Sequence, residues 1–388
     1  MKTEIRTIQK ASLLGLIILL NALTVFGQVN VDFKQFSLAG QKTVRSGMDI
    51  SPDGKYLAIA GMQNSPLFIY DWKNDKIVKE FKAGKWYAGA KVNYSKKGAY
   101  LLLQKLTYNN FNVNKDKEVD FEIVDANSGV IVKKINKVHD VEIASDESYY
   151  ITLTGEGITK YALPSGEKID RFTVESATNA IAISPNGKQI AVSHRPTLEQ
   201  VKNSPTIRND KKAKKAIKPA LKYREMVSIY DAKTYKKITT VNELYDVMYD
   251  LWYNEDGLRL YTYSVPHSKM QVSTAGRQGY IYTVNTVNWS PLRASYMSLY
   301  NYSPTVKENA NKNYLGLVSF DAGFPQVNIF DAKTGRMKET FNTRQRIWQG
   351  IKKLQTNDGR ASFAFLPSGS IFIATGNYGI IWTPELDL

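Results

Sequence analysis

The chain contains no cysteine and only three histidines among its 388 residues. The absence of cysteine excludes disulfide frameworks, thiolate zinc sites, catalytic thiols and lipid attachment at a cysteine. The sequence also lacks the metalloprotease, nucleophile-elbow, phosphate-loop and EF-hand patterns. Hydrophobic residues nevertheless make up 43% of the chain, with 24 Tyr, 15 Phe and 6 Trp. This composition provides material for a large core and excludes wholesale disorder.

Long apolar runs are scarce as well, and the one candidate lies near the N-terminus. Three basic residues within the first ten precede an apolar run over 11–20, and small residues follow it. This is the layout of a secretory signal. The alternative is an uncleaved membrane anchor, but the apolar stretch of about 17 residues contains Asn21 and is short of the roughly 20 residues that a spanning helix needs. The sequence therefore predicts a signal peptide at 1–27, cleaved after Gly27, and an exported chain 28–388 that does not span the membrane.

An internal repeat runs through the exported chain. The clearest copy begins at Met48 with Met-Asp-Ile-Ser-Pro-Asp-Gly-Lys-Tyr-Leu-Ala-Ile-Ala, and its third strand ends in Tyr70-Asp71. A matching copy begins at Ala180, contains Ser-Pro-Asn-Gly, and has a third strand that ends in Tyr230-Asp231. Asp-Gly and Asn-Gly supply the positive-φ residues that reverse a chain between antiparallel strands. Seven copies begin near residues 48, 92, 141, 180, 249, 297 and 361.

Seven four-stranded units of this kind predict an all-β, seven-bladed β-propeller, because each unit buries its faces only by stacking on its neighbours. The last copy supplies only three strands before Leu388. The segment 31–38 has strand character and precedes the first copy. We therefore expect this N-terminal strand to complete the last blade and close the ring.

The motif Ser51-Pro-Asp-Gly-Lys-Tyr-Leu-Ala-Ile-Ala, repeated with aromatic-Asp endings, resembles the WD40, TolB-type and YVTN propeller group over nearly all of residues 31–388. The sequence departs from strict WD40 repeats, because Tyr-Asp, Phe-Asp or Val-Asp replaces Trp-Asp and the Gly-His pair is absent. The resemblance implies the fold. It does not imply one function, because propellers host both binding and enzymatic activities; a lactonase-like or other hydrolytic enzyme is one alternative.

Long insertions are expected between second and third strands and between blades, which places them on one face of the ring. They are 104–118, 194–225, 265–279 and 342–360, joined on that face by the connection 82–91. The insertion 194–225 holds ten basic residues against three acidic ones. Basic residues interleaved with aromatic ones favour an acidic partner. The predicted binding residues are Trp86, Tyr87, Tyr108, Lys211, Lys212, Lys214, Lys215, Arg224, Arg344, Arg346 and Trp348.

Two less specific interpretations of these residues stay open. The run 211–218 is equally well explained as a solvated charge run, and Trp86 and Trp348 as residues that pack blades together. Among the histidines, His139 precedes a first strand and is expected to be structural. His194 and His267 lie in insertions of adjacent blades and are weak candidates for a metal or acid-base site, since they have no ligand spacing.

The sequence thus predicts an exported, non-enzymatic scaffold or accessory component of a bacterial cell envelope, periplasmic or extracellular, without catalytic residues, cofactor or metal. Its expected partner is an acidic protein, bound through the loop face. A polyanionic glycan is an alternative partner. An exported location disfavours nucleic acid.

Overall fold

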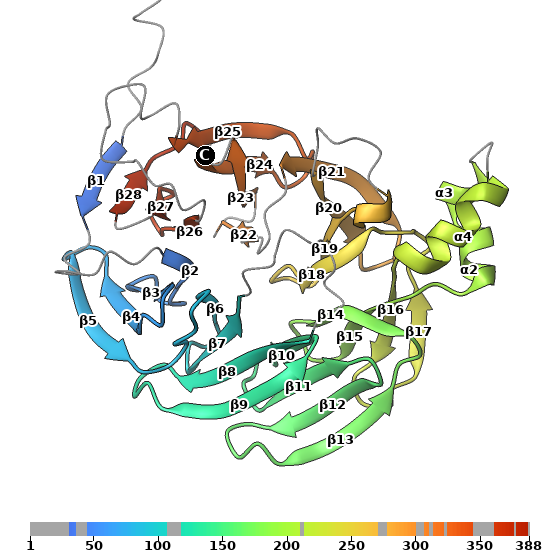
Figure 1. Cartoon of the computed structure of the whole chain (residues 1–388), viewed down its shortest axis with the longest axis horizontal. Coiled ribbons are helices and arrows are strands. Elements are labelled where there is room, and N and C mark those ends of the chain that lie inside the picture. The colour runs from blue at the N-terminus through green and yellow to red at the C-terminus, as the bar shows by residue number, and fades with distance from the viewer. Residues whose placement is uncertain are drawn as a thin grey trace, which may run out of the picture.

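Seven four-stranded antiparallel sheets surround a central axis (Figure 1). The computed structural model describes residues 31–35, 45–106, 118–209, 213–270, 278–299, 306–309, 313–321, 324–343, 361–375 and 378–386. The expected seven-bladed β-propeller is confirmed. The expected signal segment, residues 1–27, lies outside the described residues.

The strands of each blade follow one another from the axis outward. Blade one contains β2 (Arg45–Ile50), β3 (Tyr56–Gly61), β4 (Leu67–Asp71) and β5 (Lys76–Phe81). Blade two contains β6 (Ala90–Tyr94), β7 (Tyr100–Lys105), β8 (Val119–Asp125) and β9 (Ile131–Val138). Blade three contains β10 (Asp140–Ile143), β11 (Tyr149–Thr154), β12 (Gly157–Ala162) and β13 (Lys168–Thr173). Blade four contains β14 (Ala177–Ile183), β15 (Gln189–His194), β16 (Met226–Asp231) and β17 (Lys237–Thr240).

The remaining blades follow the same order. Blade five contains β18 (Val247–Tyr253), β19 (Arg259–Val265), β20 (Gln278–Asn285) and β21 (Pro291–Leu299). Blade six contains β22 (Val306–Glu308), β23 (Tyr314–Asp321), β24 (Phe324–Asp331) and β25 (Met337–Asn342). Blade seven contains β26 (Ala361–Phe365), β27 (Ile371–Thr375), β28 (Tyr378–Trp382) and β1 (Val31–Gln35). The repeat predicts a start of blade six near residue 297, whereas β21 pairs with β20 as far as Leu299 and blade six begins at Val306.

The Ser-Pro-Asp-Gly motif forms the turn between the first two strands of blade one. The Ser51 hydroxyl accepts a hydrogen bond from the Tyr56 amide at 3.0 Å, and Asp53 Oδ1 accepts one from the Lys55 amide at 3.1 Å. Gly54 has a φ of 71°, which an L side chain would strain. The motif therefore recurs along the sequence because the same kind of turn recurs between first and second strands.

The aspartates that end third strands stabilise the turn between the third and fourth strands. Asp71, Asp125, Asp231 and Asp331 each accept hydrogen bonds from the amides two and three residues later. Hydrogen bonds favour the charged carboxylate and lower the pKa of all four residues, through the Asn74 side chain first at Asp71 and through these amides first at the other three. The aspartates at the ends of third strands are thus local caps of the turn that leads into the outer strand.

The ring closes through its termini, as the sequence predicts. Strand β1 pairs antiparallel with β28, from Val31 opposite Trp382 to Gln35 opposite Tyr378. In Figure 1 β1 lies beside β28 at the outer edge of blade seven. The first and the last strand that the structure describes therefore share one sheet.

The hydrophobic core is divided among the interfaces between blades. Between blades seven and one, Tyr70 lies edge to face against Phe372 with ring centroids 5.9 Å apart. Between blades six and seven, Phe341 packs against Trp382, and both are almost fully buried. Within the part of the chain that the structure describes, no helix is both long and apolar enough to cross a bilayer.

Candidate functional site

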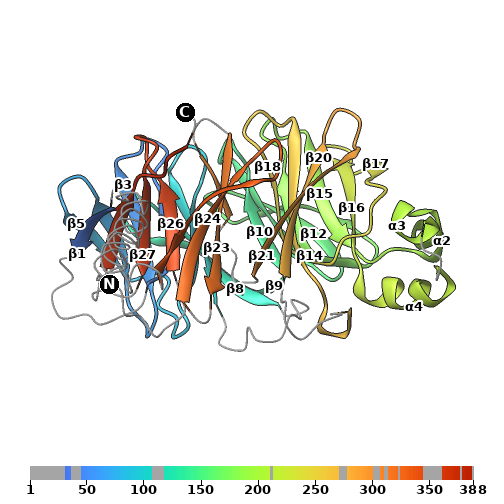
Figure 2. The ribbon, with the colours of Figure 1, turned by 90° about the horizontal axis from the view of Figure 1, so that it is seen from above.

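The basic insertion 194–225, between β15 and β16, is a compact helical unit. It contains α2 (Leu198–Asn203), α3 (Pro205–Arg208) and α4 (Ala213–Tyr223). Helix α2 begins with a capping box, in which Thr197 Oγ1 accepts from the Gln200 amide and Gln200 Oε1 accepts from the Thr197 amide. Figures 1 and 2 show the three helices outside the ring, beyond β16 and β17. The insertion therefore extends the rim of the propeller.

Apolar contacts fix this unit to blade four and to the connection that leads into blade five. The helices contribute Val201, Ile207 and Ala220 to a buried cluster that also contains Met226 and Leu244. These side chains are at most 6% exposed. Their burial gives the helices a fixed position on the ring, since short isolated helices are marginal in water.

A buried polar network anchors the end of the insertion. Glu225 is fully buried, and its carboxylate accepts hydrogen bonds from Asn179 Nδ2 at 2.7 Å and from the Met248 amide at 3.0 Å. Arg224 Nη1 lies 2.6 Å from Asp246 Oδ1, and Arg195 Nη1 lies 3.6 Å from Glu225 Oε1. The predicted binding residue Arg224 thus holds the insertion against the start of blade five.

The exposed surface of the insertion is strongly basic. Six of its cationic side chains are exposed, and they form no ion pair with any residue that the structure describes. They are Lys202, Arg208, Lys214, Lys215, Lys218 and Lys222. We call these six residues the basic helical surface. Exposed charges on anchored helices attract acidic groups and need little further ordering to bind them.

The other predicted binding residues are distributed differently. Trp86 is half-buried and packs against the core between blades one and two, whereas Tyr87 is 59% exposed. Lys214 and Lys215 belong to the basic helical surface. Tyr108, Lys211, Lys212, Arg344, Arg346 and Trp348 lie outside the described residues.

The histidines of the two insertions make structural contacts. His194 is buried, with Nε2 at 2.8 Å from Ser228 Oγ and Nδ1 at 2.9 Å from the Arg195 carbonyl, and burial lowers the pKa of its imidazole. His267 stacks on Tyr223 of α4 at 4.4 Å between ring centroids. No group of three His, Asp or Glu suited to a metal ion occurs within the described ranges. The His267 stack is a further contact between the insertion and blade five.

A cavity of about 390 Å³ lies among the innermost strands. It extends from the middle of these strands toward the turns that follow them, including Ser95, Ser145 and Pro185. These are the short turns between first and second strands. The cavity thus extends toward the face opposite that of the second-to-third-strand loops, to which the basic insertion belongs.

Two ion pairs cross the cavity. Lys91 Nζ of β6 lies 2.5 Å from Asp250 Oδ2 of β18, which joins blade two to blade five. Lys307 Nζ of β22 lies 2.7 Å from Asp49 Oδ1 and 3.1 Å from Asn93 Oδ1, which joins blade six to blades one and two. All four charged side chains are at most 25% exposed. Because these charges are largely shielded from water, the two members of each pair interact strongly across the ring.

Glu142 of β10 also lines the cavity and forms no hydrogen bond or ion pair within the described ranges. Burial, followed by the carboxylates of Asp140 and Asp250, raises the pKa of Glu142 to about 8, although Lys96 and Lys91 oppose the shift. The folded ring therefore favours the protonated form of this side chain at neutral pH.

Replacing Glu142 by glutamine is expected to change the pH dependence of stability. The folded-state pKa is raised above the ordinary value of 4.5, so this group's contribution is complete below pH 4.5 and is lost as pH rises through about 8. The Glu142→Gln variant keeps a neutral side chain and is expected to gain about 2–4 kcal/mol over the parent protein above pH 8. Urea unfolding at pH 4, 6 and 8.5 measures the difference; an equal difference at all three values contradicts the assignment.

The charged cavity was not predicted from the sequence. Its one sequence signal is a charged residue inside a first strand, as at Asp49, Lys91, Asp250 and Lys307. In a propeller the first strand lines the axis, so charged residues there face one another across the ring. The pairing itself joins residues 159 and 258 positions apart and has no local signature.

Comparison with known proteins adds one finding to this geometry. The chain is similar to a chain of hydrazine synthase from Kuenenia stuttgartiensis, with a TM-score of 0.54 and 14% sequence identity over 88% of this chain and 96% of that chain. The likeness is one of fold. No model of a known protein family matches the sequence, and no curated protein matches it. At this identity the function of the neighbour does not transfer.

Proposed function

We propose that this chain is an exported, non-enzymatic β-propeller that binds an acidic protein partner through the basic helical surface, as a scaffold or accessory component of a bacterial cell envelope. One observation carries the proposal: six exposed cations are presented on helices that a buried network and an apolar cluster fix to the ring. Solvated charge runs have no such anchoring. Preorganised charges lose less conformational entropy on binding than flexible ones do.

The proposed location in the envelope depends on the basic start and apolar run of residues 1–20, which have the layout of an export signal. Placement in the WD40, TolB-type and YVTN-like group is likewise proposed on the repeated turn and aromatic-Asp motifs. Recognition is favoured over hydrolysis, because His194 and His267 are engaged in structural contacts.

Reversing three charges of the basic helical surface is expected to weaken partner binding. The triple variant Lys214→Glu, Lys215→Glu, Lys218→Glu replaces attraction by repulsion, and we expect at least about a tenfold loss of affinity at low salt. The mature protein, purified by affinity from its native envelope, reports partners by quantitative mass spectrometry. Binding of the parent protein is expected to fall as ionic strength rises.

A matched control separates this surface from net charge. Lys76, Lys168 and Lys236 are exposed on the outer rim of blades one, three and four, so their replacement by glutamate makes the same change in total charge elsewhere. The control is expected to retain every partner of the parent protein. If both triple variants recover the same partners in the same amounts, the basic helical surface is not the binding site.

A further inference from the structure

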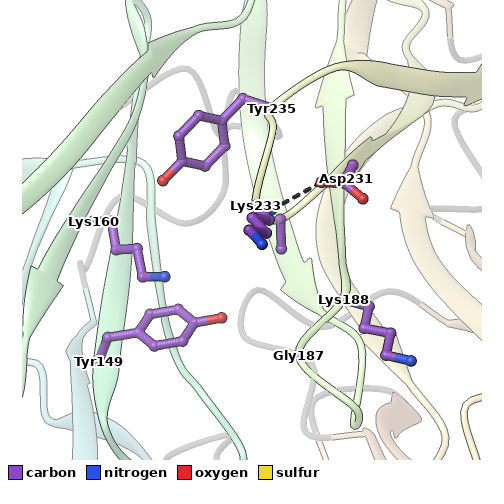
Figure 3. A pocket seen from close by; sticks show the side chains of 8 residues that line it. Tyr149, Lys160, Gly187, Lys188, Asp231, Lys233 and Tyr235 are labelled. Atoms are coloured by element: carbon purple, nitrogen blue, oxygen red, sulfur yellow. Dashed lines mark hydrogen bonds between the residues drawn. The ribbon is translucent and has the colours of Figure 1, made fainter.

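A second hollow, of about 480 Å³, lies between blades three and four. Blade three contributes Tyr149 of β11 and Lys160 of β12, and blade four contributes the turns 187–188 and 231–235. Figure 3 shows Tyr149 and Lys160 on one side, Lys188 and Asp231 on the other, and Lys233 between them. We call this the lysine hollow. It is built from turns that link first to second and third to fourth strands, so it lies on the face opposite that of the insertion loops.

The charges of the lysine hollow favour an anion. Lys160 Nζ lies 3.8 Å from the centroid of the Tyr149 ring, and neither Lys160 nor Lys233 forms an ion pair within the described ranges. Asp231 is the one acidic residue of the lining, and its Oδ1 is held by the amides of Lys233 and Thr234. The backbone of the turn therefore binds this carboxylate, and the lining sets three lysines, Lys160, Lys188 and Lys233, against its single negative charge.

The aromatic walls of the hollow are fixed. Tyr149 is 9% exposed, and Tyr235 stacks on Phe172 with ring centroids 4.4 Å apart. Burial, followed by the hydrogen bond and charge of Asp170, raises the pKa of Tyr235 to about 12, and burial raises that of Tyr149 as well. Both hydroxyls are therefore protonated near neutral pH; that of Tyr235 donates to Asp170, and that of Tyr149 can donate to a ligand. No heavy atom lies within 4 Å of the position that a Cβ would take at Gly187, which leaves that wall open.

We propose that the lysine hollow binds an acidic sugar unit, a pyranose ring that carries a carboxylate. The ammonium groups of Lys160 and Lys233 would bind the carboxylate, and the Tyr149 hydroxyl would donate to a ring or hydroxyl oxygen. Tyr235 stacks on Phe172 with one face of its ring, and the other face would supply the flat apolar surface that a sugar ring covers. The volume accommodates one or two rings. This site is independent of the basic helical surface, so either proposal can fail alone.

Calorimetric titration with galacturonic acid oligomers of two and three units tests the proposal. The parent protein is expected to bind these probes, and a galactose oligomer of equal length is expected to bind at least tenfold more weakly. The double variant Lys160→Gln, Lys233→Gln is expected to lose at least tenfold in affinity. The single variant Lys233→Gln alters only an exposed side chain and is expected to lose about threefold, which keeps the test valid if the double variant is less stable.

A control variant and competing anions separate sugar binding from a general preference for negative charge. The variant Lys168→Gln, Lys236→Gln removes two exposed ammonium groups outside the hollow and is expected to bind like the parent protein. Equal binding of the galactose oligomer overturns the proposal. Equal or tighter binding of inorganic phosphate or of an oligoglutamate peptide also overturns it, because the hollow would then select charge without selecting a sugar.

Discussion

A chain that begins at residue 41 is expected to unfold at a melting temperature about 10 °C below that of the chain that begins at residue 28. The shorter chain lacks β1, which pairs with β28 over five residues. Loss of the backbone hydrogen bonds in this pairing, at about 1 kcal/mol each, removes on the order of 4–6 kcal/mol. The deletion also cuts the covalent link by which blade seven is completed from the N-terminal side. Blade seven is then left with three strands and an unpaired outer edge.

A chain that begins at residue 31 provides the control. It loses three residues but retains β1 in full, so its melting temperature is expected to equal that of the longer chain. Differential scanning calorimetry and the far-ultraviolet circular dichroism of all three chains measure the effect. An unchanged melting temperature for the chain that begins at residue 41 would contradict the hypothesis that terminal pairing stabilises the ring.

Replacing Lys91 by methionine is expected to lower the free energy of unfolding by about 3–4 kcal/mol. Methionine preserves much of the side-chain volume but leaves Asp250 without its cation inside the ring, and an uncompensated carboxylate at such a site is costly. Asp250 raises the pKa of Lys91 even though burial of the ammonium opposes this. The charged pair is therefore the favoured state of the two side chains.

The double variant Lys91→Met, Asp250→Leu distinguishes the pair from the packing around it. We expect it to recover most of the stability lost by Lys91→Met, because the double variant removes both charges from the cavity. Urea unfolding of the parent protein, the two single variants and the double variant gives the coupling energy. A coupling energy near zero would mean that water in the cavity screens the pair.

The fold was accessible from the sequence because its determinants are local. Ser51, Asp53 and Gly54 direct one turn within six residues, and the aspartates at the ends of third strands cap the next turn through amides two and three positions away. Each repeat therefore carries its own signal. The closing strand β1 was accessible for a related reason, since an incomplete last copy requires a strand from elsewhere.

The candidate sites were harder to predict from the sequence. The insertion is dense in lysine, and this obscured the helical spacing of Ala216, Ile217, Ala220 and Leu221, which pack on the ring. The lysine hollow joins side chains of two blades, and the charged cavity joins blades on opposite sides of the axis. Such groupings depend on how blades stack and on which way each strand faces, and neither is encoded within one repeat.

The cross-axis pair of Lys91 and Asp250 has a consequence for how the ring comes apart. Blades of a propeller touch only their neighbours, so a ring without other links can open one interface at a time. Blades two and five are separated by two blades along the chain, and the ion pair links them directly through the centre. A displacement of blade two therefore breaks a contact with blade five as well as those with blades one and three. The ion pair at the centre of the ring therefore couples blades that do not touch, and we expect it to raise the cooperativity of unfolding.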